Sequence, residues 1–174
     1  KLHLHLTDDN GWRLEIKQYP LLTSIGSKKV KREGLSFPER RNARQGEPLV
    51  DGGFYTQEDI KEIVAYAAGR QIEVIPEIAM PGHSNAALAA YPLLACPVID
   101  QYIGVIPGLG GDHTRFAYCA GNDEVFTFLQ HVIDEVVELF PSRFIHLGGD
   151  AIHDTHWEEC PLCRERMKKE GLDD

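Results

Sequence analysis

The stretch Phe144-Ile-His-Leu-Gly-Gly-Asp150 decides the fold expected for this chain. Phe144 to Leu147 is a short apolar run, which is typical of a buried strand in a parallel sheet. The two glycines that follow allow a tight turn and the close approach of a ligand. Asp150 then places a carboxylate at the C-terminal end of the strand, where catalytic residues lie in an α/β barrel. Taken alone, the same residues also fit a turn with a helix cap.

Two earlier segments repeat this arrangement of a strand followed by polar residues. Residues 2–6 alternate strictly between leucine and histidine and lead into Thr7-Asp-Asp-Asn10. Residues 72–78 predict another strand, which leads into Ala79-Met-Pro-Gly-His83. Because parallel strands end at the same edge of a sheet, one site at that edge explains all three segments together. The residues expected to meet there are His5, Asp8, His83 and Asp150.

The segments between the predicted strands have the periodicity of helices. This alternation of strands and helices predicts right-handed parallel βαβ units. Thr56-Gln-Glu-Asp59 resembles a capping box, and Asn122 can cap a long amphipathic helix. A long polar surface loop is expected over residues 26–53 and irregular structure over 92–121. The expected helices cover residues 56–69, 84–91, 123–140 and 155–170.

Composition narrows the class of protein and of partner. The 174 residues carry 18 basic and 27 acidic side chains, for a net charge of −9, which argues against nucleic acid and anionic membranes as partners. We find no apolar run of membrane-spanning length in the sequence.

The four cysteines leave two interpretations open. Cys96 and Cys119 flank the irregular stretch and could form a disulfide in an oxidising compartment, but free thiols explain them equally well. Cys160 and Cys163 form a CxxC pair with no second pair nearby in the sequence. The spacing therefore predicts no metal site.

Three motifs, in this order, resemble glycoside hydrolase family 20, the β-N-acetylhexosaminidases. They are His3-Leu-His-Leu-Thr-Asp-Asp-Asn-Gly-Trp-Arg13, Pro76-Glu-Ile-Ala-Met-Pro-Gly-His83 and His146-Leu-Gly-Gly-Asp-Ala151. The resemblance implies an α/β fold of the (β/α)8 TIM-barrel type. Residues 1–174 would form about three strand–helix units of that single catalytic domain. The remainder of the barrel would come from a longer chain or another copy, because a full barrel takes roughly 250 residues.

The resemblance also implies the chemistry. Family members remove terminal non-reducing GlcNAc or GalNAc from glycans with retention, using the substrate's own acetamido oxygen as nucleophile. It implies no cofactor, no metal and a secreted or periplasmic location. Asp150 would orient the acetamido group, and position 151 would carry the acid/base. The implied catalytic residues are Asp150, the residue at 151, Asp8 and His83, and the implied substrate-binding residues are His5, Asp9, Glu77 and His146.

Two positions depart from the family pattern. Ala151 stands where the family has its acid/base Glu, and losing such a group costs about 10²–10⁴-fold in rate. Ala79 stands where the family has Asp. Either the enzyme has been disabled, which the intact motif around position 151 favours, or the chain is a natural amino-sugar-binding relative that does not cleave. A nucleotide-binding domain is disfavoured, because no GxGxxG or GxxxxGK[ST] motif follows a predicted strand.

Overall fold

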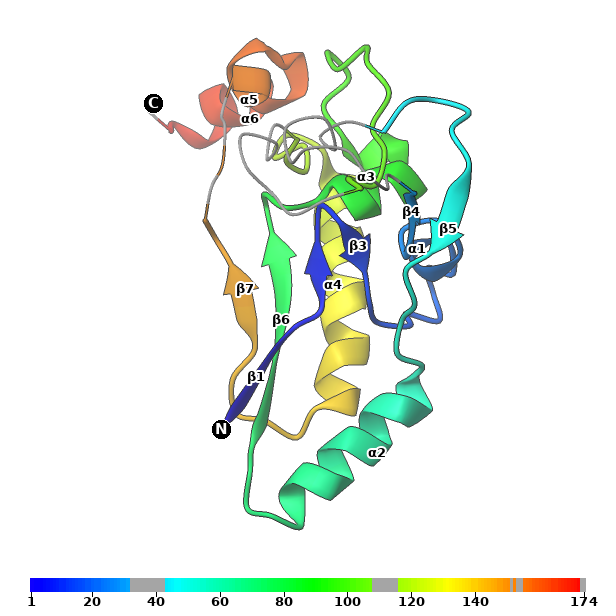
Figure 1. Ribbon diagram of the computed structural model, residues 1–174. Coiled ribbons are helices and arrows are strands. Elements are labelled where there is room, and N and C mark those ends of the chain that lie inside the picture. Colours follow the sequence, from blue (N-terminus) through cyan, green and yellow to red (C-terminus); the bar gives the residue numbers. More distant parts are fainter. Residues whose placement is uncertain (32–42, 108–115, 151, 153–154, 173–174) are drawn as a thin grey trace.

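The computed structural model describes residues 1–31, 43–107, 116–150, 152 and 155–172 of the chain. Strands and helices follow one another along it, and the described residues include one 3₁₀ turn (Figure 1). The elements are β1 (Leu2–His5), β2 (Thr7–Asp8), β3 (Gly11–Trp12), α1 (Leu21–Ser24), β4 (Lys28–Val30), β5 (Leu49–Asp51), α2 (Gln57–Ala68), β6 (Val74–Met80), α3 (Asn85–Ala90), η2 (Pro92–Leu94), α4 (Asp123–Leu139), β7 (His146–Gly148), α5 (Thr155–Glu159) and α6 (Pro161–Glu170).

A three-stranded parallel sheet in the order β1-β6-β7 organises the molecule. β1 pairs with β6 from Leu2↔Val74 to His5↔Glu77, and β6 pairs with β7 at Glu77↔His146. Helix α2 precedes β6 and α4 precedes β7, so both connections are strand–helix–strand crossovers, with α4 running alongside the strands in Figure 1. The parallel βαβ units expected from the sequence are confirmed. All three strands end at the same edge of the sheet.

The two crossover helices begin where their caps predict. Thr56 caps α2 through its hydroxyl, which accepts from the Asp59 backbone N–H, and the Asp59 carboxylate accepts from the Thr56 backbone N–H. Asn122 caps α4 by accepting from the Glu124 backbone N–H at 3.0 Å. Each cap satisfies backbone donors that the first helical turn leaves unpaired. The inner face of α4 then buries apolar side chains against the core, at Val125, Phe128, Val132, Val136 and Leu139.

The segment that begins at β3 extends the core beyond the end of β1. Trp12 is 1% exposed and donates its indole N–H to the Leu14 carbonyl at 2.7 Å. Leu14 and Ile16 are buried beside it. Burying a large apolar side chain stabilises a fold by about 1.5–3 kcal/mol, so this segment anchors the sheet end that carries the polar residues.

Arg13 fixes the same segment through backbone carbonyls. Its guanidinium donates to the carbonyls of Asn10, Ser27 and Gly53, at 2.8 Å in each case. Burial lowers the pKa of Arg13 from its usual value. One side chain therefore ties together three loops, two of which are distant from it in the sequence.

Two sequence expectations about loops and helices need correction. The segment 26–53 is not entirely loop, because β4 and β5 pair antiparallel from Lys28↔Asp51 to Val30↔Leu49. Residues 32–42 of this segment lie outside the described residues. The expected helix over 155–170 is two helices, α5 and α6. Pro161 lies in the first turn of α6, where its missing N–H breaks no helical hydrogen bond, and it separates the two.

A third correction concerns the buried strand expected from Phe144 to Leu147. β7 begins at His146, not at Phe144, and the Phe144 side chain is 56% exposed. Within the described residues β7 has a neighbour on one side only, so it is an edge strand and not a buried one. Leu147 on β7 and Leu2 on β1 are 47% and 42% exposed, as expected for an open portion of a barrel.

Among the described residues, we find no helix that combines the length and apolar character needed to cross a membrane.

Candidate active site

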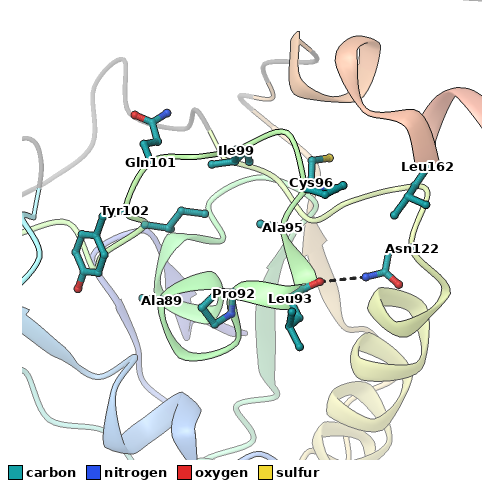
Figure 2. A pocket seen from close by; sticks show the side chains of 12 residues that line it. Ala89, Pro92, Leu93, Ala95, Cys96, Ile99, Gln101, Tyr102, Asn122 and Leu162 are labelled. Atoms are coloured by element: carbon teal, nitrogen blue, oxygen red, sulfur yellow. Dashed lines mark hydrogen bonds between the residues drawn. The ribbon is translucent and has the colours of Figure 1, made fainter.

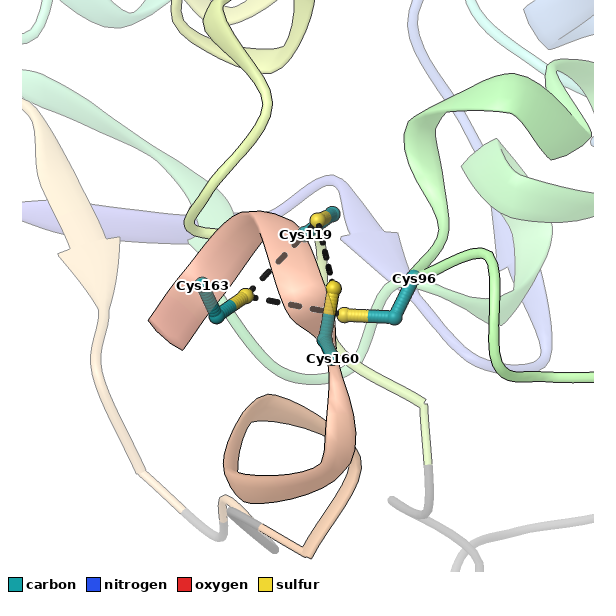
Figure 3. Close-up of side chains that lie close together, drawn as sticks. All are labelled: Cys96, Cys119, Cys160 and Cys163. Carbon is teal, nitrogen blue, oxygen red and sulfur yellow. Dashed lines mark hydrogen bonds between the residues drawn. The ribbon is translucent and has the colours of Figure 1, made fainter. Parts of the chain in front are cut away.

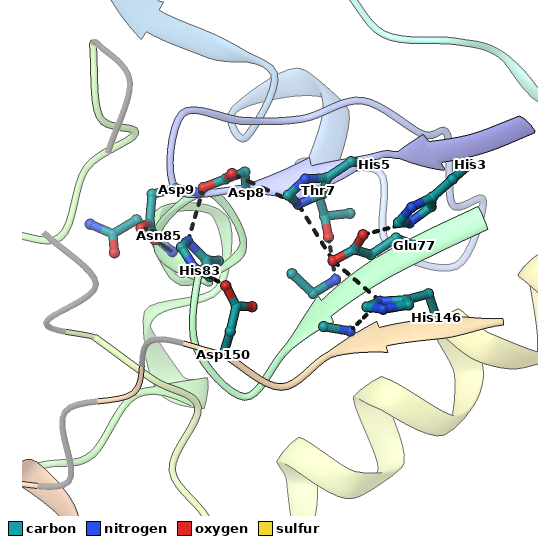
Figure 4. Close-up of polar contacts among 12 residues, drawn as sticks. His3, His5, Thr7, Asp8, Asp9, Glu77, His83, Asn85, His146 and Asp150 are labelled. Atoms are coloured by element: carbon teal, nitrogen blue, oxygen red, sulfur yellow. Dashed lines mark hydrogen bonds and ion pairs between the residues drawn. The ribbon is translucent and has the colours of Figure 1, made fainter. Parts of the chain in front are cut away.

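His83 is the centre of a polar cluster at the C-terminal ends of the three strands (Figure 4). Its Nδ1 lies 3.2 Å from Asp8 Oδ1 and 3.4 Å from Asp9 Oδ2, and its Nε2 lies 3.5 Å from Asp150 Oδ2. His5 Nε2 approaches the same group, 3.7 Å from Asp8 Oδ2. The structure thus brings together all four residues expected to meet here, and we call Asp8, Asp9, His83 and Asp150 the strand-end cluster.

The backbone at His83 contributes to this arrangement. Its φ of 52° lies in the left-handed region, where histidine is one of the few non-glycine residues found with any frequency. The His83 side chain is 18% exposed and faces carboxylates through both ring nitrogens. The close contact with Asp9 raises the pKa of His83 to about 9, with help from the charges of Asp8 and Asp150 and against the effect of burial. The imidazole is therefore a cation at neutral pH.

Asp9 is the buried member of the strand-end cluster, at 1% exposure. Its Oδ1 accepts from the Asn85 backbone N–H at 3.1 Å, whereas its buried Oδ2 has no partner among the described residues beyond the ion pair with His83. Burial raises the pKa of Asp9, and the contacts with His83 and Asn85 oppose that rise. Burying a carboxylate is unfavourable, yet Asp9 is buried and holds the His83 imidazole in place. This marks His83 as a candidate functional group.

Glu77 organises a second group, beside the strand-end cluster on β1, β6 and β7. Its carboxylate is nearly buried and lies 2.6 Å from His3 Nε2, 3.9 Å from His5 Nε2 and 3.4 Å from His146 Nδ1. His146 Nδ1 also accepts from the Gly148 backbone N–H at 3.0 Å.

His3 also belongs to this group, although it is not among the site residues expected from the sequence. Its signal was present, because the strict alternation of residues 2–6 places His3 and His5 on the same face. What the sequence did not reveal is that strand pairing would place Glu77 next to both. The His3 and His146 rings also lie 5.0 Å apart between centroids, across the width of the sheet.

Both groups contain residues able to hold a metal ion. The ligand atoms of His3, Glu77 and His146 lie within 4.8 Å of one another, and so do those of Asp8, Asp9 and His83. In each group the carboxylates already pair with imidazoles. The arrangement therefore supplies charge, hydrogen-bond donors and acceptors without requiring an ion.

The glycine turn after β7 presents Asp150. Gly148 and Gly149 have φ values of 74° and 92°, in the left-handed region that favours glycine. A Cβ on Gly148 would lie 3.1 Å from the Ala79 Cα, so β6 and the turn are in close contact. The tight turn predicted from the sequence is confirmed. The Asp150 side chain is 73% exposed, whereas Ala151, the position of the expected acid/base, lies outside the described residues.

An apolar hollow lies away from these polar groups. A cavity of about 350 Å³ is formed around η2 and the loop that follows it, where Asn122 donates to the Leu93 carbonyl at 3.1 Å (Figure 2). Its described lining residues include neither Glu77 nor any member of the strand-end cluster. The polar groups, and not this cavity, mark the candidate active site.

The four cysteines meet in one place, and we call Cys96, Cys119, Cys160 and Cys163 the four-cysteine cluster (Figure 3). All four are buried and free. The disulfide considered for Cys96 and Cys119 is therefore not formed in the structure. The CxxC pair was expected to hold no metal because it lacked a second pair nearby, but folding brings two distant cysteines to it.

Comparison with known proteins identifies the family. Residues 1–174 match the model for glycosyl hydrolase family 20, catalytic domain. A curated beta-hexosaminidase from Porphyromonas gingivalis is 46% identical over 174 residues, which are 100% of this chain and 20% of that protein. The crystal structure of beta-N-acetylhexosaminidase from Bacteroides fragilis matches with a TM-score of 0.74 and 44% identity, covering 99% of this chain and 29% of that one.

A third relative was solved with a sugar bound. It is the GH20 exo beta-N-acetylglucosaminidase from Vibrio harveyi in complex with N-acetylglucosamine, with a TM-score of 0.76 and 32% identity, covering 99% of this chain and 26% of that one. The chain thus spans between 20% and 29% of the length of these three relatives. It belongs to glycosyl hydrolase family 20, and it forms part of that family's catalytic (β/α) barrel.

Proposed function

We propose that the protein containing this chain acts on glycans that end in a non-reducing N-acetylhexosamine, by the retaining, substrate-assisted route of β-N-acetylhexosaminidases. One observation carries the proposal. The strand ends converge on Asp150, an exposed carboxylate with an imidazolium at 3.5 Å, in a chain whose relatives are named beta-hexosaminidases. The support comes from the site's chemistry together with family membership.

Asp150 is assigned the acetamido group of the substrate. When the acetamido oxygen attacks the anomeric carbon, the group gains positive charge as an oxazolinium ion, which a carboxylate stabilises. His83 fixes the direction of the Asp150 carboxylate, and Asp8 and Asp9 fix His83 in turn. In this assignment His83 and Asp8 act by positioning, and Asp150 is the residue that contacts the reacting group.

Glu77, His5 and His146 are assigned to sugar hydroxyl groups. The imidazoles of His5 and His146 are 46% and 52% exposed, so their outer edges can meet a ligand, while Glu77 is nearly buried beneath them. A buried carboxylate beneath exposed imidazoles gives a polar surface of fixed geometry. Such a surface suits a ligand that offers hydroxyl groups as both donors and acceptors.

Ala151 limits what the chain does as written. Alanine neither donates nor accepts a proton, so the leaving oxygen would depart without general-acid help, at a cost of about 10²–10⁴-fold in rate. We therefore propose that the chain with Ala151 binds substrate and hydrolyses it slowly or not at all. Ala79 favours a second candidate, an amino-sugar-binding relative that never cleaves, because a second motif position also lacks its family carboxylate.

The test compares Ala151→Glu with Ala151→Gln in the full-length protein. Both side chains have nearly the same size, but only Glu supplies a proton. Hydrolysis of an aryl β-N-acetylglucosaminide by the Glu variant and not by the Gln variant supports the enzyme. Tight binding of a thiazoline-type mimic without hydrolysis by either variant, even with Ala79→Asp added, supports the binding protein. Failure of all variants to bind the mimic contradicts both.

A further inference from the structure

The spacing of the sulfur atoms in the four-cysteine cluster matches a metal site and not disulfides. In a tetrahedral site with Zn–S bonds of about 2.3 Å, neighbouring sulfur atoms lie about 3.8 Å apart. A disulfide brings two sulfur atoms to about 2.05 Å. The Sγ–Sγ distances are 3.9 Å for Cys96–Cys163, 3.7 Å for Cys119–Cys160 and 3.7 Å for Cys119–Cys163, and all four atoms lie within 4.8 Å of one another.

The cluster is also closed to solvent. Cys119 and Cys160 are 0% exposed, and Cys96 and Cys163 are 2% and 3% exposed. Reactive and redox-active cysteines need access to their partners, so burial of the whole CxxC pair argues against such a role. Four thiolates around one ion leave no open coordination position, which is the pattern of a structural and not a catalytic zinc site.

The surrounding backbone approaches the cluster closely. A Cβ on Gly121 would lie 2.2 Å from the Leu162 carbonyl carbon, so only glycine fits against α6 at this point. Cys160 is the N-cap residue of α6 and Cys163 lies in its first turn, where the helix dipole favours negative charge. The start of α6 therefore offers a favourable place for negative charge beside the cluster.

The segment that contains α5 and α6 needs such an anchor. Helix α5 buries none of its residues, and α6 buries only Cys163. Its other contacts with the body of the domain include a hydrogen bond from the Trp157 indole N–H to the Tyr118 carbonyl at 2.9 Å and an ion pair between Arg166 and Asp123. An exposed ion pair contributes little, and the main apolar contact of the segment is the partly buried Trp157, so the four-cysteine cluster is its most extensively buried attachment.

We propose that the four-cysteine cluster binds one structural Zn²⁺ ion, which fastens the α5–α6 segment to the loops that precede α4 and follow η2. Each thiol gives up its proton to solvent when the ion binds, and no oxidant is involved. The segment follows the turn that carries Asp150, so the ion also limits how far that turn can move. This site is separate from the proposed glycosidase chemistry, and it does not depend on it.

Metal analysis of the full-length protein tests the proposal first. We expect about one zinc ion per chain after purification without added metal, and none in a Cys160→Ser/Cys163→Ser variant. His3→Gln is the matched control, because it alters another potential metal-binding group and leaves the cysteines intact; it should keep its zinc. Iron in place of zinc, disulfides detected by mass, or zinc lost from the His3 variant would overturn the assignment.

A second measurement does not depend on whether the cysteine variant folds. A mercurial thiol reagent added to the native wild-type protein should release zinc in step with modification of the four thiols, as read by a zinc-sensitive dye. Zinc that stays bound after all four thiols are modified would contradict the proposal. Zinc released before any thiol reacts would contradict it as well.

Limited proteolysis tests the fastening role. Trypsin should cleave after Arg164 or Lys168 in α6 at least about tenfold faster once zinc has been removed, because local opening then costs less free energy. Cleavage after Lys61, which is exposed on α2, is the internal control and should not change. Re-addition of Zn²⁺ should restore protection. Equal cleavage of α6 with and without zinc would mean that the ion does not hold the segment.

Discussion

His83 Nε2 lies 3.5 Å from Asp150 Oδ2, although α3, η2 and α4 lie between the two residues along the chain. The contact exists because β6 and β7 are adjacent and parallel, so both end at the same edge of the sheet. On one side the His83 ring contacts the carboxylates of Asp8 and Asp9. On its other side it contacts Asp150, which is the most exposed carboxylate of the strand-end cluster. The position of Asp150 therefore depends on the charge of His83.

The ionisation of His83 should make stability depend on pH. Its pKa is raised from 6.5 to about 9, so the contribution of the imidazolium is fully present below about pH 6.5 and is lost as the pH rises through about 9. We expect about 1–2 kcal/mol, after allowance for solvent screening of the three facing carboxylates. Thermal unfolding of wild type and His83→Gln in the full-length protein should differ at pH 6 and converge toward pH 10. A constant difference across that range would contradict the assigned charge.

Rate and affinity should respond differently to the two residues at the end of the glycine turn. Ala151→Glu should raise kcat about 10²–10⁴-fold and change the affinity for a thiazoline-type mimic only modestly, because protonation matters only as the bond breaks. Asp150→Ala in the same background should weaken binding of the mimic, whose ring resembles the charged intermediate. Calorimetry and hydrolysis of an activated aryl glycoside measure the two effects. The opposite pattern would reverse the assigned roles.

The glycine turn should tolerate substitution unequally. Gly148→Ala and Gly149→Ala both place a side chain on left-handed backbone, at about 1–2 kcal/mol each. Only Gly148 also faces β6, where its Cβ would meet the Ala79 Cα at 3.1 Å, whereas nothing lies within 4 Å of a Cβ on Gly149. Gly148→Ala should therefore lower the melting temperature more. Equal shifts would mean that the contact with β6 relaxes freely.

Arg13 should resist even a conservative change. In Arg13→Lys, a single ammonium group replaces the planar guanidinium that donates to three backbone carbonyls. We expect this change to lower the free energy of unfolding by about 1–3 kcal/mol. Arg70→Lys is the matched control, since Arg70 is exposed just beyond the end of α2 and covers the Tyr66 ring. Denaturant unfolding of both variants makes the comparison. Similar losses would show that the three carbonyls find other donors.

The local structure and the polar residues at the strand ends could be predicted from the sequence alone. Caps and periodicity predicted α2 and α4 within one or two residues, because both signals act between neighbours in the chain. Polar residues after each strand predicted the strand-end cluster, because parallel strands share an edge. The same reasoning predicted one helix where α5 and α6 stand, since it did not weigh Pro161 as a helix start.

Contacts between distant residues could not be predicted from the sequence and follow from the packing of the whole fold. Cys96 and Cys119 are isolated in the sequence, and nothing local indicates that Cys160 and Cys163 pack against them. In the same way, the register of β1 against β6 chose Glu77 as the partner of His3. These contacts join segments far apart in the chain, and their free energy depends on the whole packed arrangement. Local patterns therefore show which residues are available, and long-range packing selects the pairs.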